Sequence, residues 1–152
     1  MAEETPRHRL LPYAALTGTY AAGLSLFLRR WRKDLPTETN ALDVALVGLA
    51  THKATRLIAK DKITTVFRAP FTEYQGPGGP SEVEESPRGS GLRHAIGELI
   101  VCPYCLGQWV ATAFAGGLVA APRQTRFLAA VMSALAISDF LQIAYKVGEE
   151  QL

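Results

Sequence analysis

Three long apolar stretches, separated by clusters of charged residues, dominate the hydropathy pattern of this 152-residue chain. They cover Leu10–Leu28, Glu98–Ala121 and Phe127–Tyr145. Each is close to the roughly 20 helical residues needed to cross a hydrocarbon layer about 30 Å thick. Helices of soluble proteins normally keep one polar face, which these stretches almost entirely lack. The pattern therefore predicts three transmembrane helices. The alternative is a water-soluble bundle of unusually apolar helices.

A fourth helix is predicted over Ala41–Ala59, and its two halves differ. Val44–Ala50 is wholly apolar, whereas the second half and the residue after it carry basic side chains. At about 100° per residue these fall in one broad stripe of the helix surface; they are His52, Lys53, Arg56 and Lys60. Such a helix can enter the bilayer and let its basic side chains reach the headgroups. It can equally span the bilayer with the basic stripe facing the interior of a bundle.

The segment between the fourth helix and the second stretch is predicted to lie outside the bilayer. Asp61–Phe71 mixes apolar and basic residues, which suits the membrane interface, and residues 75–91 are rich in Gly, Pro, Ser and Glu, which predicts a flexible loop. We divide the chain into an N-terminal transmembrane helix with a basic flank, residues 1–40, and a membrane domain, residues 41–152. The expected fold class is all-α: an integral membrane bundle of three transmembrane helices plus a fourth that spans or re-enters.

Small residues recur at every fourth position of the three apolar stretches. This spacing places them on one helix face, where two backbones can approach closely. The expected packing residues are Ala14, Gly18 and Ala22; Ala113, Gly117 and Ala121; and Ala130, Ala134 and Ser138. We therefore expect a compact bundle or a homo-oligomer. Aromatic residues near the predicted helix ends suit anchoring at headgroup level; they are Trp31, Tyr104, Trp109 and Tyr145.

The distribution of charge bears on location. Net charge is only +2, and the basic residues flank apolar stretches, where anionic headgroups attract them, so nucleic acid is not an expected partner. The basic run within residues 29–33 follows the first stretch directly, which is a stop-transfer pattern and not a cleavage site. We expect a multi-pass protein of the bacterial inner membrane. We prefer a topology in which Ala41–Ala59 does not cross, because the positive-inside rule then places residues 29–93 in the cytoplasm.

The only two cysteines, Cys102 and Cys105, form a Cys-Pro-Tyr-Cys sequence near the start of the second apolar stretch. A helix N-terminus favours a thiolate, as a redox pair requires, but no βαβ pattern surrounds the motif and no second pair relays electrons. Two thiolates could instead supply half of a tetrahedral zinc site, which His94 and His52 or a second chain would complete. In a third interpretation the thiols only pack against their neighbours.

Asp139 is the one acidic residue inside the last apolar stretch. An unpaired charge at membrane depth is costly, so such a residue marks either a functional site or a buried ion pair. We expect an ion pair with Arg56, Lys53 or His52 on a neighbouring helix.

Three short stretches together resemble a known family. They are Ala54–Ile58 leading into Asp61–Ile63, then Arg68–Phe71, and finally Gly97–Leu99 leading into Cys102–Trp109. They are similar to a domain of unknown function found in small bacterial integral membrane proteins, some of them associated with sporulation. The resemblance covers roughly residues 42–145 and leaves out the first apolar stretch. It implies that the Thr-Arg-Leu segment belongs to a membrane helix, and it implies no established activity.

The expected function is non-enzymatic. We expect a structural or assembly component of the bacterial membrane that binds the bilayer and either protein partners or itself, and the sequence identifies no small-molecule substrate. A thiol-disulfide redox protein using Cys102 and Cys105 is the first alternative, and a metal-binding membrane protein is the second. No cofactor is expected except zinc in that second alternative. Recognisable nucleophile, phosphate-loop and nucleotide motifs are absent from the sequence.

Overall fold

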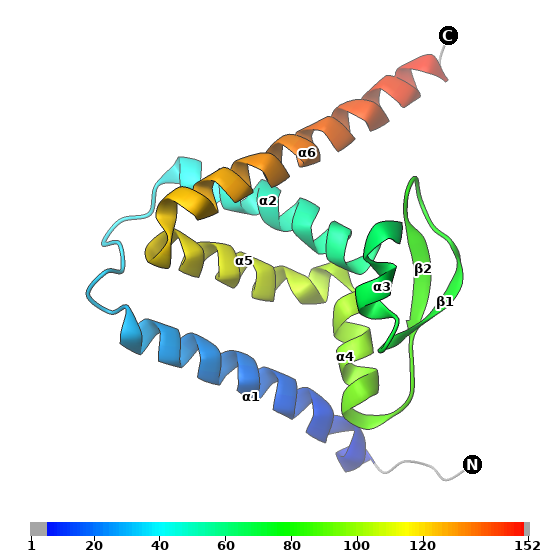
Figure 1. The fold of residues 1–152 in the computed structure, drawn as a ribbon, viewed down its shortest axis with the longest axis horizontal. Helices are drawn as coiled ribbons and strands as arrows, with labels where there is room; N and C mark the ends of the chain where they lie inside the picture. Colours follow the sequence, from blue (N-terminus) through cyan, green and yellow to red (C-terminus); the bar gives the residue numbers. More distant parts are fainter. Residues whose placement is uncertain (1–5, 151–152) are drawn as a thin grey trace.

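Four long helices and a small cap of short elements make up the computed structural model, which describes residues 6–150 (Figure 1). The long helices are α1 (Pro6–Arg30), α2 (Ala41–Ala59), α5 (Pro103–Ala120) and α6 (Pro122–Glu149). The cap comprises η1 (Lys62–Thr64), α3 (Thr65–Arg68), β1 (Thr72–Pro77), β2 (Val83–Pro87) and α4 (Gly91–Val101). Residues 1–5 and 151–152, which our division of the chain includes, lie outside the description.

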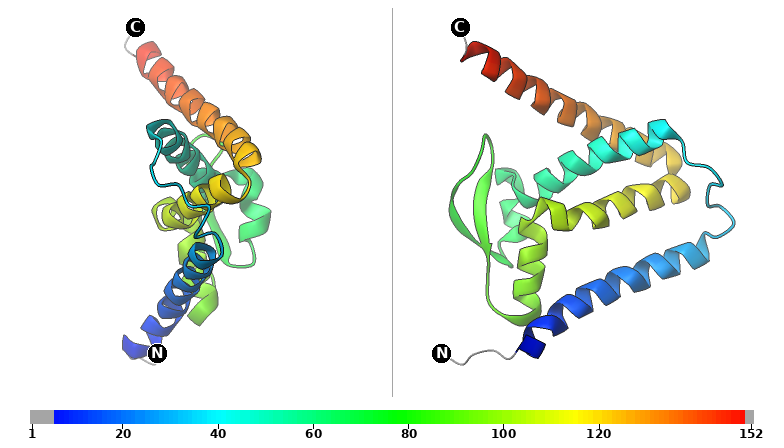
Figure 2. Two further views of the ribbon diagram at one scale, coloured as in Figure 1. Left: turned by 90° about the vertical axis from the view of Figure 1, so that its left-hand side faces the viewer. Right: turned by 180° about the vertical axis from the view of Figure 1, so that it is seen from behind.

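The long helices are spread out side by side, and the molecule is thin when seen edge-on (Figure 2). The cap lies at one end of the helices, and the connector between α1 and α2 lies at the other (Figure 1). Among the described helices, two are long and apolar enough to cross a membrane: α1, over Leu10–Arg30, and α6. α4 and α5 pass the same test only as a pair, and they are bent by 82° where they meet.

This bend corrects the expectation of one continuous helix over Glu98–Ala121. Cys102 has an extended backbone and caps the start of α5, and Pro103 occupies the first turn. Proline lacks an N–H and disfavours helical geometry in the residue before it, so it ends α4 and begins a new helix. Glu98 therefore belongs to the cap helix α4 and not to the long helix α5.

A second correction concerns residues 75–91, where we expected a flexible loop within an all-α fold. The chain forms an antiparallel hairpin there, pairing Thr72 with Pro87 and Pro77 with Val83 across a bulge after Tyr74. The hairpin is bonded to the end of α2: the Val83 N–H donates to the Lys60 carbonyl at 2.9 Å, and the Lys62 N–H donates to the Ser81 carbonyl at 2.9 Å. The fold is thus mostly helical with a small two-stranded sheet.

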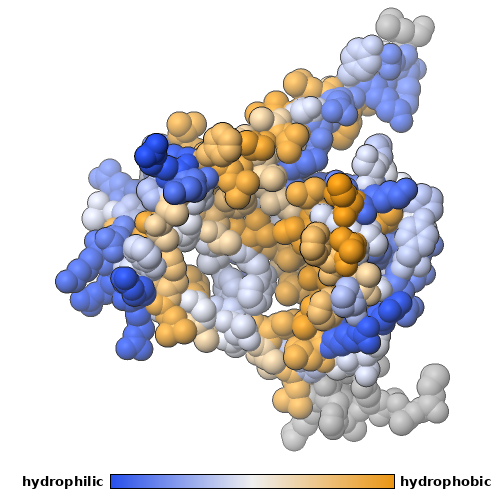
Figure 3. Space-filling view, in the orientation of Figure 1, coloured by the Kyte–Doolittle hydropathy of each residue, from blue (hydrophilic) through white to orange (hydrophobic). Residues whose placement is uncertain are grey.

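The core between the helices is built from small residues. Ala50 and Ala54 of α2 meet Phe114 of α5 and Ala129 of α6, with larger side chains packed around them. Many large apolar residues are exposed instead, including Leu26, Phe127 and Ile143. In the space-filling view, apolar side chains gather over the middle of the molecule and polar ones over the connector end and the hairpin end (Figure 3).

The small residues that the spacing singled out lie mostly outside this core. Ala14, Gly18 and Ala22 are exposed on α1, and Ala113, Ala130 and Ala134 are exposed on α5 and α6; Gly117, Ala121 and Ser138 are partly buried. The face of α6 that is buried within the chain carries Ala129, Ser133 and Ala136. A spacing of four fits several faces of one helix, so the pattern alone does not select the face that packs.

Candidate functional site: the ion-paired cap and the cysteine elbow

Acidic residues of the hairpin bind the basic stripe of α2. Both Glu82 carboxylate oxygens accept hydrogen bonds from Arg56 Nη2, at 2.6 and 2.7 Å. Further along, Lys60 Nζ lies 2.8 Å from a Glu84 oxygen. These ion pairs help to hold a hairpin with few apolar residues against the end of α2, whose basic residues lie more than twenty positions earlier in the chain.

Arg68 is the most enclosed charged residue of the cap. Its side chain and that of its partner Glu85 are each 2% exposed, and Arg68 Nε donates to the Glu85 carboxylate. Arg68 also donates to the Ile58 carbonyl at 2.7 Å, the Asp61 carbonyl at 3.0 Å and the Thr64 hydroxyl at 2.5 Å. One guanidinium therefore ties α2, η1 and the hairpin together. The sequence alone does not predict this role, because a single Arg two residues before Pro70 gives no local signal for it.

Asp139 of α6 is paired with Lys53 of α2. Lys53 Nζ lies 2.6 Å from Asp139 Oδ2, with side chains 18% and 41% exposed. The other two partners that we considered are engaged elsewhere: Arg56 binds Glu82, and the ring of His52 stacks on Phe140 with centroids 5.3 Å apart. A second pair, Arg126 with Asp43 at 2.9 Å, joins the same two helices near their starts.

The cysteines lie at the elbow between α4 and α5. The Cys105 N–H donates to Cys102 Sγ at 3.2 Å, and both thiols are free. Partial burial raises the pKa of the Cys102 thiol, but hydrogen bonds from the Cys105 thiol and from the backbone N–H groups of Cys105 and Tyr104 outweigh it and leave this pKa below its usual value. The Cys102 thiol therefore ionises more readily than an ordinary cysteine thiol.

A cavity of about 540 Å³ adjoins the elbow. Both cysteines line it together with Tyr13 of α1, Glu98 of α4 and Trp109 of α5. The Tyr13 hydroxyl donates to the Glu98 carboxylate, whose other oxygen lies 3.6 Å from His94 Nε2. The elbow therefore combines two thiols, one carboxylate and an apolar wall.

The proposed zinc ligands are not brought together in one place. His94 faces Glu98 within α4, whereas His52 lies on α2 against α6. Among the residues whose side chains the structure describes, 10–150, no group of three or more His, Cys, Asp or Glu has a geometry that could hold a metal ion. The donor set present at the elbow does not fit a tetrahedral zinc site formed by one chain.

The four aromatic residues expected as anchors occupy different environments. Tyr104 is 94% exposed and Tyr145 is 68% exposed, Tyr104 at the elbow and Tyr145 near the end of α6. Trp31 stacks on Phe27 at the connector end. Trp109 packs edge-on against Tyr20 with centroids 5.0 Å apart, and the Tyr20 hydroxyl lies 2.7 Å from Thr112 Oγ1. Trp109 therefore helps to hold α1 against α5.

Comparison with known proteins gives a family and one named relative. No solved structure matches the chain. The sporulation protein YjcA of Bacillus subtilis (strain 168) is 35% identical over 75 residues, which cover 47% of this chain and 64% of that relative, less than two thirds of its length. The profile of a family described as "Protein of unknown function (DUF1360)" matches residues 46–145. That match runs from α2 to α6, leaves out α1 and covers more than half of the sequence. The chain therefore belongs to the DUF1360 family of proteins of unknown function.

Proposed function

We propose that this chain is a multi-pass protein of the bacterial cytoplasmic membrane in which α1, α2, α5 and α6 all cross the bilayer. Its proposed role is non-enzymatic, as a structural or assembly component that binds a protein partner through the cap. The distribution of side-chain sizes supports the membrane placement, because small residues are buried between the helices while large apolar residues are exposed. Such a surface is unfavourable in water, whereas lipid tails solvate it.

The position and the charges of α2 support its crossing. It packs along both α5 and α6, and with 19 residues it is about 28 Å long at about 1.5 Å per residue. Its acid Asp43 and its base Lys53 are each paired with a residue of α6. Paired charges suit membrane depth far better than isolated ones. These contacts favour the full-span alternative, which replaces our preference for a helix that does not cross.

The main observation that supports the proposed role is the ion-paired cap, which is held in one shape at one end of an apolar bundle. Exposed Ile63, Val66 and Phe67 of η1 and α3 suit the headgroup boundary, which leaves the hairpin facing water. A surface held in one shape binds a partner without the cost of ordering it. Because the relative from Bacillus subtilis is named a sporulation protein, we propose that this partner acts in spore formation.

Photo-crosslinking from the hairpin tests this role. A benzoylphenylalanine in place of the exposed Tyr74 should give a discrete protein adduct in intact cells of the native host. The same group in place of Ile143, on the exposed face of α6, should give no such adduct. The Tyr74 adduct should persist in a Cys102→Ser/Cys105→Ser variant. An adduct that depends on the cysteines, or none from the hairpin, would contradict the proposed role.

Thiol-disulfide exchange at Cys102 and Cys105 is the second candidate. The lowered pKa of Cys102 and the short reach between the two residues favour it, because the thiolate is the attacking species. Acid-trapping of intact cells, followed by alkylation with a mass-tagged maleimide, measures the redox state. If the protein catalyses thiol-disulfide exchange, a fraction of it should be tagged only after reduction. Full tagging of both thiols without reduction would exclude it.

A further inference from the structure

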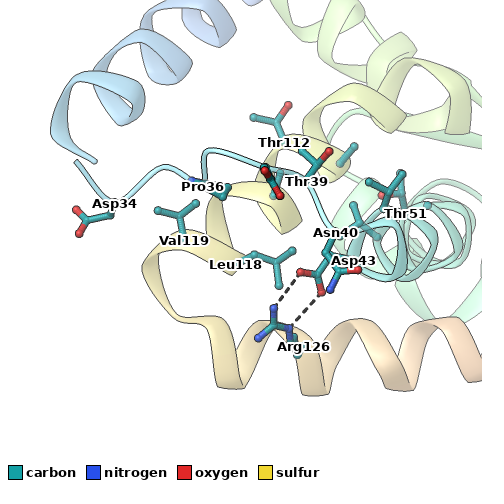
Figure 4. A pocket seen from close by; sticks show the side chains of 16 residues that line it. Asp34, Pro36, Thr39, Asn40, Asp43, Thr51, Thr112, Leu118, Val119 and Arg126 are labelled. Atoms are coloured by element: carbon teal, nitrogen blue, oxygen red, sulfur yellow. Dashed lines mark hydrogen bonds and ion pairs between the residues drawn. The ribbon is translucent and has the colours of Figure 1, made fainter. Parts of the chain in front are cut away.

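A second cavity lies beside the connector between α1 and α2 (Figure 4), at the end of the bundle opposite the cap (Figure 1). Its volume is about 710 Å³, within the range of about 300–1,000 Å³ that is typical of ligand sites. Apolar residues of α2 and α5 form its walls, among them Val47, Gly48, Ala115 and Leu118. There is free space beside Gly48, because an added Cβ there would meet no atom within 4 Å.

The rim of this cavity is polar and carries both signs of charge. Asp34 and Glu38 of the connector are exposed, and neither forms an ion pair with any residue in the described part of the chain. Arg126 uses Nε and Nη2 to bind Asp43, at 3.2 and 2.9 Å (Figure 4). Its side chain is 56% exposed, and a guanidinium has five N–H donors, so donors remain for a second anion.

We propose that this cavity binds one zwitterionic phospholipid per chain. An acyl chain would lie along the apolar walls, the phosphate would meet Arg126, and the ammonium group would meet Asp34 or Glu38. The charged side chains that line the cavity are three carboxylates and one guanidinium, so direct contacts at the rim favour a headgroup that carries both charges over one that carries only negative charge. The inference rests on the proposed crossing of α2 and α5, because that crossing places the walls at hydrocarbon depth and the rim at the headgroups.

Native mass spectrometry of the purified, delipidated full chain tests this site. The probes are palmitoyl-oleoyl phosphatidylethanolamine and palmitoyl-oleoyl phosphatidylglycerol, which share their acyl chains and differ in headgroup. The wild type should bind one ethanolamine lipid with about tenfold preference over the glycerol lipid, a ratio typical of one good charge contact. In an Asp34→Asn/Glu38→Gln variant this preference should disappear.

Gly48→Leu and Gly107→Leu form a matched pair of variants. Both glycines are helical with open space around them, so both changes raise helix propensity, but only Gly48 lines the cavity. Gly48→Leu should abolish the bound lipid, and Gly107→Leu should leave it unchanged. Equal binding by both variants, or equal binding of both lipids, would overturn the proposal. If the lipid site fails this test, extraction of the membranes with alkaline carbonate shows whether the proposed membrane placement fails as well. Protein that stays in the membrane but binds no lipid refutes the lipid site alone.

Discussion

Arg68 lies at the joint between α2 and the hairpin, where its guanidinium meets the Glu85 carboxylate, the Thr64 hydroxyl and two backbone carbonyls. The arrangement satisfies a charge that would otherwise be costly to bury. We predict that Arg68→Met destabilises the cap by about 3–5 kcal/mol, because it leaves Glu85 buried without its partner. Limited proteolysis within residues 78–82 and thermal unfolding in detergent measure the effect.

Arg88→Met is the matched control for this prediction. Arg88 pairs with Glu73 on the same hairpin, but their side chains are 44% and 54% exposed. Such a pair contributes only about 0–1 kcal/mol, so this variant should keep its cap. The double variant Arg68→Met/Glu85→Leu should recover much of the lost stability, because it leaves no unpaired charge. If Arg68→Met and Arg88→Met unfold alike, the cap does not depend on the buried pair.

At the scale of elements, the packing of α4 on the hairpin depends on a glycine. A Cβ at Gly97 would lie 2.6 Å from the Phe71 carbonyl oxygen and 3.0 Å from Pro87 Cβ. Because a backbone atom is the obstacle, Gly97→Ala should cost about 1–3 kcal/mol and loosen the cap. Gly107→Ala should instead stabilise the protein, since nothing lies within 4 Å of its Cβ position and alanine favours a helix over glycine by about 1 kcal/mol. Unfolding midpoints of the two variants compare these effects, and equal shifts would contradict this packing.

The elements differ in how far the sequence predicts them. Ala41–Ala59 is a helix with the bounds expected from its pattern, and the first and last apolar stretches lie within α1 and α6, because local hydropathy suffices for helices of this length. The hairpin is not predictable from local sequence, because Glu82, Glu84 and Glu85 bind basic residues far earlier in the chain. The sequence shows the basic stripe of α2 but does not predict its partners. The Gly, Pro and Glu composition of residues 75–91 does not indicate which distant residues the segment pairs with.

At the scale of the whole molecule, an apolar band separates two polar ends (Figure 3). The connector between α1 and α2 lies at one end, and the hairpin and the elbow lie at the other. If α2 crosses the bilayer, these two ends are on opposite sides of the membrane. If α2 re-enters instead, the connector and the hairpin share one side. The proposed four-helix membrane bundle therefore requires that α2 crosses the bilayer.

The accessibility of introduced cysteines in intact cells measures directly whether α2 crosses the membrane. Arg32→Cys in the connector and Tyr74→Cys in the hairpin, each placed in the Cys102→Ser/Cys105→Ser background, are exposed positions for a membrane-impermeant maleimide. We predict that one variant is labelled in intact cells and that the other is labelled only after the membrane is permeabilised. Labelling of both variants from the same side would contradict the crossing of α2 and, with it, the proposed bundle.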